Sequence, residues 1–178
     1  LSPASGNPII VPTQDIILGI YYMSLEREGE SGEGMAFADL GEIQKAIDEG
    51  AVTLHTRIKA RYIGVDNDGN STRELVDTTP GRMLISDILP RHPEIGFDAI
   101  NQVLTKRAVS TLIDIVYRSY GQKETVIFCD RMMTLGFSNA FRAGISFGKD
   151  DLLIPAAKET LVSETQVRIE EYEQQYLD

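Results

Sequence analysis

The sequence predicts an α+β fold, in which a small antiparallel sheet is accompanied by several helices and by a long C-terminal helix. Apolar and polar residues alternate through residues 53–65, as in a strand with one face in water, and the turn-forming run 66–70 follows. Apolar residues then recur at helical spacing over 100–121 and again over 126–137. With 178 residues, 42% of them hydrophobic and 25% charged, the chain has the composition of a globular protein with a core.

The N-terminal segment, residues 1–13, contains three prolines and is expected to be extended and rich in turns. Thr13 is in position to cap a helix that would run to about Met23, since threonine is a favoured N-cap residue. Residues 26–34 consist mainly of glycine and glutamate, which predicts a loop.

A short helix is predicted by Asp39 and Glu42, which are spaced as in a capping box, and by Gly50, which would end it. The sheet would come next. Its first strand would lead through the hairpin turn into a return strand at 74–76, because an Asp-Gly pair tolerates the backbone of a tight turn. A third strand is predicted around 82–85, and all connections would be short.

The helical stretch 126–137 carries apolar residues on both sides, so we expect it to lie in the core. Cys129 lies in this stretch and is the single cysteine of the chain. It can form no internal disulfide, and we interpret it as a small buried hydrophobic residue, which favours a reducing compartment.

The last segment predicts a helix of about 20 residues that starts at Pro155. Its apolar residues form one narrow stripe, made by Leu161, Val162, Ile169, Tyr172 and Tyr176. Because nearly all other residues there are polar, we expect this helix to be one arm of a helical hairpin whose second arm would follow Asp178.

The charge balance excludes some classes of function. The 27 acidic and 17 basic residues give a net charge of -10, which argues against a surface that wraps duplex nucleic acid, since phosphates require clustered cations. No apolar run approaches the roughly 20 residues that span a bilayer, and the first residues lack the pattern of a signal peptide.

A hydrolase motif is present in form, since residues 144–148 match the Gly-x-Ser-x-Gly pattern around a nucleophilic Ser146. That pattern requires a preceding strand, a following helix and a histidine within reach. Here a helical pattern precedes it, while His55 falls in a strand pattern and His92 between two prolines. A stand-alone serine hydrolase is therefore the alternative hypothesis and not the leading one.

Two groups of carboxylates could bind a metal ion. A calcium-loop pattern is suggested by Asp66, Asp68, Asn70, Glu74 and Asp77. Its glycine falls at the fourth position, where the sixth is required, and its last ligand is Asp in place of a bidentate Glu, so a hairpin turn explains the run better. Asp150 and Asp151 are either a metal pair or, more simply, solvated carboxylates before a helix.

Residues 1–19 strongly resemble the segment of the bacterial RNA polymerase beta-prime subunit that follows its catalytic loop. The resemblance covers essentially the whole chain and is weakest over 25–38 and near the hairpin turn. It continues through residues 21–23, 77–82, 101–106, 125–130, 134–137 and 144–151.

The resemblance implies that residues 1–154 form the pore region below the active centre, where the secondary channel admits nucleoside triphosphates and receives the RNA end during backtracking. Residues 155–178 would form the first arm of the helices at the channel rim, which secondary-channel regulators grip. The implied protein partners are the beta subunit, the alpha dimer, omega and sigma, and the implied nucleic acids are template DNA and RNA. The implied compartment is the cytoplasm, without a membrane.

The resemblance also implies where the chemistry lies. The magnesium-binding signature of the family, NADFDGD, is absent from this sequence and is expected just upstream of Leu1. Without those carboxylates two-metal phosphoryl transfer has no metal site, so we expect no catalytic residue, metal or cofactor in this chain, and no activity from it alone. Magnesium would belong to the complete enzyme.

The implied site residues are few. Gln14 and Lys106 match positions near the incoming nucleotide or the RNA end, and lysine suits a mobile polyphosphate as a point charge. From the residues alone, Lys106 is either part of a solvated face or a phosphate contact. Lys123, Ile127 and Asp130 match positions that bind the alarmone guanosine tetraphosphate against omega in some bacterial enzymes.

One residue departs from the family, because Thr134 stands where the family has a tyrosine beside the alarmone. The substitution removes an aromatic contact from that site.

A third hypothesis is that the chain is not part of a polymerase but a stand-alone interaction module that acts through the C-terminal helix.

Overall fold

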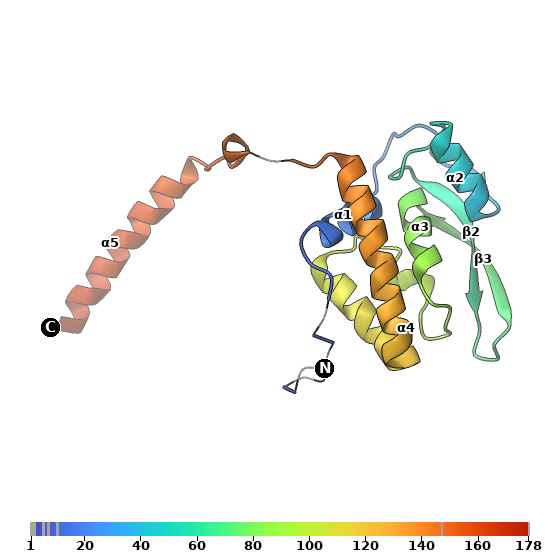
Figure 1. Ribbon diagram of the computed structural model, residues 1–178. Coiled ribbons are helices and arrows are strands. Elements are labelled where there is room, and N and C mark those ends of the chain that lie inside the picture. Colours follow the sequence, from blue (N-terminus) through green and yellow to red (C-terminus); the bar gives the residue numbers. More distant parts are fainter. Residues whose placement is uncertain (1–2, 5, 7, 10, 147, 178) are drawn as a thin grey trace. The chain divides into compact units, whose positions relative to one another are not determined.

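The computed structural model describes residues 3–4, 6, 8–9, 11–146 and 148–177, which form two compact units, 1–144 and 145–178. Residues 1–2, 5, 7 and 10 of the segment expected to be extended and rich in turns, and Phe147 of the Gly-x-Ser-x-Gly pattern, lie outside the described residues. The α+β prediction is confirmed, since the described part contains five α-helices and one three-stranded sheet (Figure 1).

Helix α1 (Asp15–Ser24) is confirmed close to its predicted bounds, but its N-cap is Gln14 and not Thr13. The backbone of Gln14 has φ 51, so the chain turns there and Thr13 lies one residue too early to cap the helix. α1 packs against helix α4 (Lys106–Ala143) almost backbone to backbone at Gly19, where an added Cβ would lie 1.9 Å from the carbonyl oxygen of Gly136.

The sheet has the order β1-β2-β3. Strands β2 (Ile58–Val65) and β3 (Ser71–Thr78) pair antiparallel, which confirms the predicted hairpin. β1 (Ala36–Phe37) pairs parallel to β2, so the sheet is mixed and not wholly antiparallel. A strand of two residues leaves no alternation to detect in the sequence, and for this reason it was not expected.

The hairpin turn is held by Asp66, whose carboxylate accepts hydrogen bonds from the backbone N–H groups of Asp68 (3.0 Å) and Asn70 (2.8 Å). Gly69 supplies the positive φ of 83. These hydrogen bonds lower the pKa of the Asp66 carboxyl, led by the one from Asn70. The run that resembles a calcium loop is therefore a hairpin turn.

Two strand predictions are wrong. Residues 53–57 precede β2 and form a turn, in which the Thr53 N–H donates to Oγ1 of Thr56 at 2.9 Å. The strand expected at 82–85 is part of helix α3 (Pro80–Ile88), whose N-cap is Thr79. Pro80 at the first helical position sets its φ for a helix, and this local signal overrides the apparent alternation.

Helix α2 (Leu40–Asp48) begins as predicted, because Asp39 Oδ1 accepts the Glu42 N–H at 2.9 Å. The Glu42 carboxylate accepts the N–H of Ala38 at 2.7 Å, and Gly50 follows the helix with φ 71. A 3₁₀ turn, η1 (Phe97–Ala99), lies between α3 and α4.

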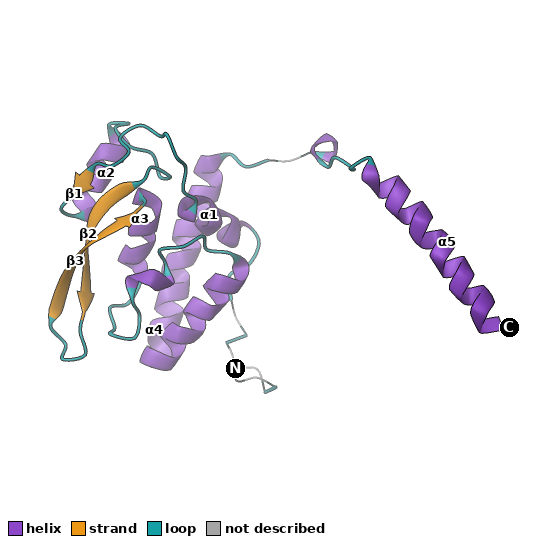
Figure 2. Cartoon of the chain, turned by 180° about the vertical axis from the view of Figure 1, so that it is seen from behind, coloured by secondary structure: helices purple, strands orange, loops and turns teal. Residues whose placement is uncertain are grey.

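Helix α4 (Lys106–Ala143) is interrupted at Gly121, which has φ 75 and ψ -170, so it consists of two segments as predicted. α3 lies between the sheet and α4 in both views (Figures 1 and 2). The core contains α1, α3 and both segments of α4, with Leu112, Phe128 and Met132 among its fully buried side chains.

The second segment of α4 lies in the core as expected, but only one of its two apolar sides is buried. Phe128 and Met132 face the core, but Val126, Met133 and Phe137 are 52%, 42% and 49% exposed. α1 covers one side of this segment only, within the part of the chain that the structure describes. Cys129 is half-buried, and burial raises the pKa of its thiol.

The second unit, 145–178, contains the 3₁₀ turn η2 (Lys149–Asp151) and helix α5 (Ala157–Leu177). α5 begins two residues after Pro155, close to the prediction. All its described side chains are exposed, including those of the apolar stripe. Among the described helices, none combines the length and apolar character that a membrane span requires.

Candidate functional site

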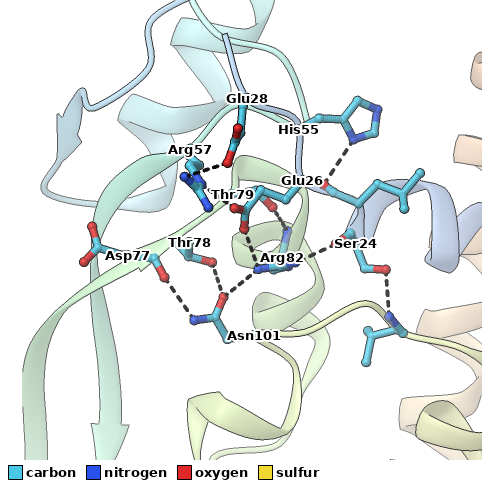
Figure 3. Close-up of polar contacts among 12 residues, drawn as sticks. Ser24, Glu26, Glu28, His55, Arg57, Asp77, Thr78, Thr79, Arg82 and Asn101 are labelled. Carbon is cyan, nitrogen blue, oxygen red and sulfur yellow. Dashed lines mark hydrogen bonds and ion pairs between the residues drawn. The ribbon is translucent and has the colours of Figure 1, made fainter. Parts of the chain in front are cut away.

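Arg82, in the first turn of α3, is the centre of a polar cluster between α1, α3 and the loop before α4 (Figure 3). Arg82 is only 7% exposed. Its Nε donates to the carbonyl oxygen of Ser24 (3.0 Å), and its Nη1 donates to Glu26 Oε2 (3.2 Å) and Asn101 Oδ1 (3.3 Å). Burial lowers the pKa of Arg82 and Glu26 raises it again, while an arginine remains charged in any case.

Glu26 is shared by two arginines, because its second oxygen accepts a hydrogen bond from Arg57 Nε. That hydrogen bond raises the pKa of the Arg57 guanidinium. Arg57 also pairs with the exposed Glu28 at 3.3 Å. The Arg82–Glu26 pair is largely shielded from water and matters for stability, whereas the exposed Arg57–Glu28 pair contributes little.

Asn101 connects three elements through its side chain. Its Oδ1 accepts hydrogen bonds from Thr78 Oγ1 (2.9 Å) and from Arg82, and its Nδ2 donates to the carbonyl oxygen of Asp77 (3.0 Å). The end of β3, the start of α3 and the loop before α4 are thereby joined at one amide.

Ser24 fixes the other end of that loop. Its hydroxyl donates to the carbonyl oxygen of Tyr21 (2.8 Å) and accepts the N–H of Leu104 (2.8 Å), and both Ser24 and Leu104 are fully buried. Thr105 then caps α4 by accepting the Ala108 N–H at 3.4 Å. Lys106 is the next residue and is exposed.

A cavity of about 440 Å³ lies beside the cluster and is lined by both signs of charge, including Glu26, Arg57, Lys59, Asp77 and Arg82. Since Glu26 already binds both arginines, their charge is compensated within the chain. This arrangement gives the cavity no selectivity for an anion or a cation, and we assign it no ligand.

The predicted pair Gln14 and Lys106 is not brought together within the chain. Gln14 is exposed at the N-terminal end of α1, whereas Lys106 follows Leu104, which is bonded to Ser24 at the C-terminal end. The ten residues of α1 rise by roughly 15 Å between these ends. Any shared ligand would have to be extended.

The predicted residues Lys123, Ile127 and Asp130 do lie together, since spacings of four and three place them on one face of α4. Lys123 and Asp130 are exposed and Ile127 is half-buried. Thr134 continues this face, and its hydroxyl donates to the carbonyl oxygen of Asp130 at 3.1 Å.

The surroundings of Ser146 do not fit a hydrolase. Ser146 follows helix α4 where a strand is required, and the three-residue turn η2 comes after it. His55 is buried against Tyr22 with its Nδ1 3.3 Å from the carbonyl oxygen of Leu25, while His92 contacts the ring of Tyr120. Both histidines are engaged in contacts that hold the fold.

A metal site would require several suitable ligands in one place. Within the described ranges, no three His, Cys, Asp or Glu side chains gather as they would around a metal ion. No chemical step is therefore assigned to magnesium among the described residues.

The cluster of Ser24, Arg82 and Asn101 was not found from the sequence. Arg82 was assigned to a strand, in which its side chain would alternate toward water. The signal that could have found it is the Thr79–Pro80 pair, because a capped helix starting there turns residue 82 inward.

The family model described as RNA polymerase Rpb1, domain 3, matches residues 1–152, which include this cluster, Gln14 and Lys106.

Proposed function

Because the chain belongs to the RNA polymerase Rpb1, domain 3, family and is thus part of the largest subunit of a DNA-directed RNA polymerase, we propose that it lines the secondary channel of a bacterial enzyme. Its partners are the other polymerase subunits and nucleic acids. In this proposal the subunit is beta-prime, the neighbours are beta, the alpha dimer, omega and sigma, and the compartment is the cytoplasm.

The observation that carries the proposal is the setting of Lys106. Its ammonium group is exposed at the N-terminus of the capped helix α4, and no ion pair holds it among the described residues. A helix N-terminus carries a partial positive charge, so it and the lysine favour the same anionic ligand. Triphosphates and the RNA backbone are such ligands.

The acidic balance of the chain supports a channel wall over a duplex clamp. A net charge of -10 repels loosely bound nucleic acid, so a single placed cation such as Lys106 would mark the route taken by phosphate groups. Duplex DNA would be held by other parts of the enzyme.

Two parts divide this work in the proposal. Residues 1–154 form the pore region, and residues 155–178 form the first arm of the channel-rim helices. The exposed apolar stripe of α5, with Ile169 and Tyr172, supports a helical partner along that side. Regulators that enter the channel would bind this rim.

A second role is favoured by the shared face of Lys123, Ile127 and Asp130. We propose that it forms part of an alarmone site next to omega, where the ammonium contacts a phosphate and the carboxylate accepts from the guanine. The chain does not carry the carboxylates for metal-dependent nucleotide transfer in this proposal, so the isolated chain is inactive.

The test is Lys106→Ala in the complete polymerase, with the KM for nucleoside triphosphates as the readout. Loss of one exposed phosphate contact of about 1 kcal/mol raises KM about fivefold. Lys45→Ala is the matched control, because Lys45 is an exposed lysine on α2 that pairs with Glu49. If the two variants have the same KM, Lys106 does not contact the nucleotide.

A further inference from the structure

The loop 101–105 connects η1 to α4 and ends directly before Lys106. It is fixed at both ends by polar contacts, which are partly buried at Asn101 and fully buried at Ser24. At its start the Asn101 amide makes three side-chain hydrogen bonds, and near its end the Leu104 N–H donates to the Ser24 hydroxyl. The backbone from which Lys106 extends is therefore fixed by the half-buried Asn101 and the fully buried Ser24.

Arg82 contacts both anchor residues. Its Nε donates to the Ser24 carbonyl at 3.0 Å, and its Nη1 donates to the Asn101 amide oxygen at 3.3 Å. Asn101→Ala would remove one acceptor of this buried guanidinium and leave Nη1 with Glu26. Ser24→Ala would keep the backbone carbonyl that Nε binds and remove the hydroxyl that accepts the Leu104 N–H.

We infer that Asn101 and Ser24 are positioning residues for Lys106, which set where its ammonium group meets phosphate in the channel. This inference rests on the proposed function of Lys106. The side chain of Lys106 is long, exposed and unpaired among the described residues. The fold therefore controls the position of the ammonium group through the position of the Lys106 backbone.

Small displacements matter for such a contact. A shift of about 1 Å in a group that orients a substrate can reduce a rate by as much as about 100-fold. Functional groups accordingly require a supporting shell of hydrogen bonds. The Ser24–Arg82–Asn101 cluster provides such a shell, because it holds the loop that leads into Lys106.

The test is a double-mutant cycle in the complete polymerase, with KM and kcat for nucleoside triphosphates measured separately. Asn101→Ala and Ser24→Ala are each expected to raise KM about three- to fivefold when Lys106 is present. In a Lys106→Ala background the same substitutions are expected to change KM by less than about 1.5-fold, because the group they position is gone. Ser24→Ala removes fewer contacts and keeps the test valid if Asn101→Ala prevents assembly.

The matched control is Asn139→Ala, which removes a second hydrogen-bonded asparagine, itself buried, whose Nδ2 donates to the Leu135 carbonyl within α4; it is expected to leave KM unchanged. If Lys106→Ala raises KM while Asn101→Ala and Ser24→Ala do not, or act equally in both backgrounds, this inference fails alone. If Lys106→Ala leaves KM unchanged, the proposed role of Lys106 fails, and the inference fails with it.

Discussion

Substitution of Gly19 by alanine is expected to destabilise the fold at the crossing of α1 and α4. A Cβ at residue 19 would lie 1.9 Å from the Gly136 carbonyl oxygen and 3.0 Å from the Ala140 nitrogen, and all these neighbours are backbone atoms. The opposite helix is equally close, since a Cβ at Gly136 would lie 2.6 Å from the Ile16 carbonyl oxygen. Neither helix can relieve the clash by rotating a side chain.

The magnitude follows from two opposing effects. Overpacking of a core costs about 3 kcal/mol at the upper end of its usual range. Alanine is the better helix former by about 1 kcal/mol, which leaves a net loss of about 2 kcal/mol. For a chain of this size that loss lowers Tm by about 4–8 °C.

The assay is thermal unfolding of the 178-residue chain, followed by circular dichroism. Gly96→Ala is the matched control, because Gly96 has φ -69 and an added Cβ there would have no neighbour within 4 Å. It is expected to leave Tm unchanged or raise it slightly. A Gly19→Ala chain with the parental Tm, or an equal loss in both variants, would refute the close contact of α1 and α4.

Three further outcomes are expected. Burial lowers the pKa of His55, more than its hydrogen bond to the Leu25 carbonyl raises it, so its neutral form stabilises the fold above the unfolded pKa of about 6.5. That contribution to the free energy of unfolding is lost as the pH falls below about 6.5. Between pH 7 and pH 5, urea unfolding should therefore show a smaller loss of stability for His55→Phe than for the parental chain; equal losses would contradict a lowered pKa of His55. Glu26→Gln should cost about 1–2 kcal/mol in urea unfolding because Arg82 stays buried, while Glu28→Gln should cost less than about 0.5 kcal/mol, and equal costs would disprove the distinction. In equilibrium binding to the complete polymerase, Lys123→Ala should weaken guanosine tetraphosphate about three- to tenfold, and unchanged affinity would exclude this face as its site.

Local signals in the sequence predicted several elements correctly. Asp66 and Gly69 specified the hairpin turn, Asp39 with Glu42 specified the start of α2, and Gly121 marked the break in α4. Each of these signals acts between residues at most a few positions apart. Hydrogen bonds to nearby backbone groups, or a φ that favours glycine, suffice to explain them.

The errors share a different cause. Strand β1 exists only because β2 lies beside it, and the exposed side of the second α4 segment depends on which helices cover it. The cluster around Arg82 is likewise formed by long-range contacts, since Arg82 and Ser24 are 58 residues apart in sequence. Periodicity describes one segment at a time and carries no information about such partners.

The candidate site was predictable in part, and through resemblance. Gln14 and Lys106 were selected because they match a family pattern, and nothing in their spacing indicated that α1 would hold them apart at its two ends. Lys123, Ile127 and Asp130 are different, because helical spacing alone places them on one face once the helix is known.

A crosslinking measurement at residue 106 tests most directly whether this chain lines the secondary channel. A photoreactive phenylalanine analogue in place of Lys106, in the complete polymerase with a backtracked RNA, is predicted to crosslink to the extruded RNA 3′ end, while the same analogue at Lys45 is predicted not to. Crosslinking from residue 106 that does not exceed the Lys45 control would contradict the claim that this chain lines the secondary channel.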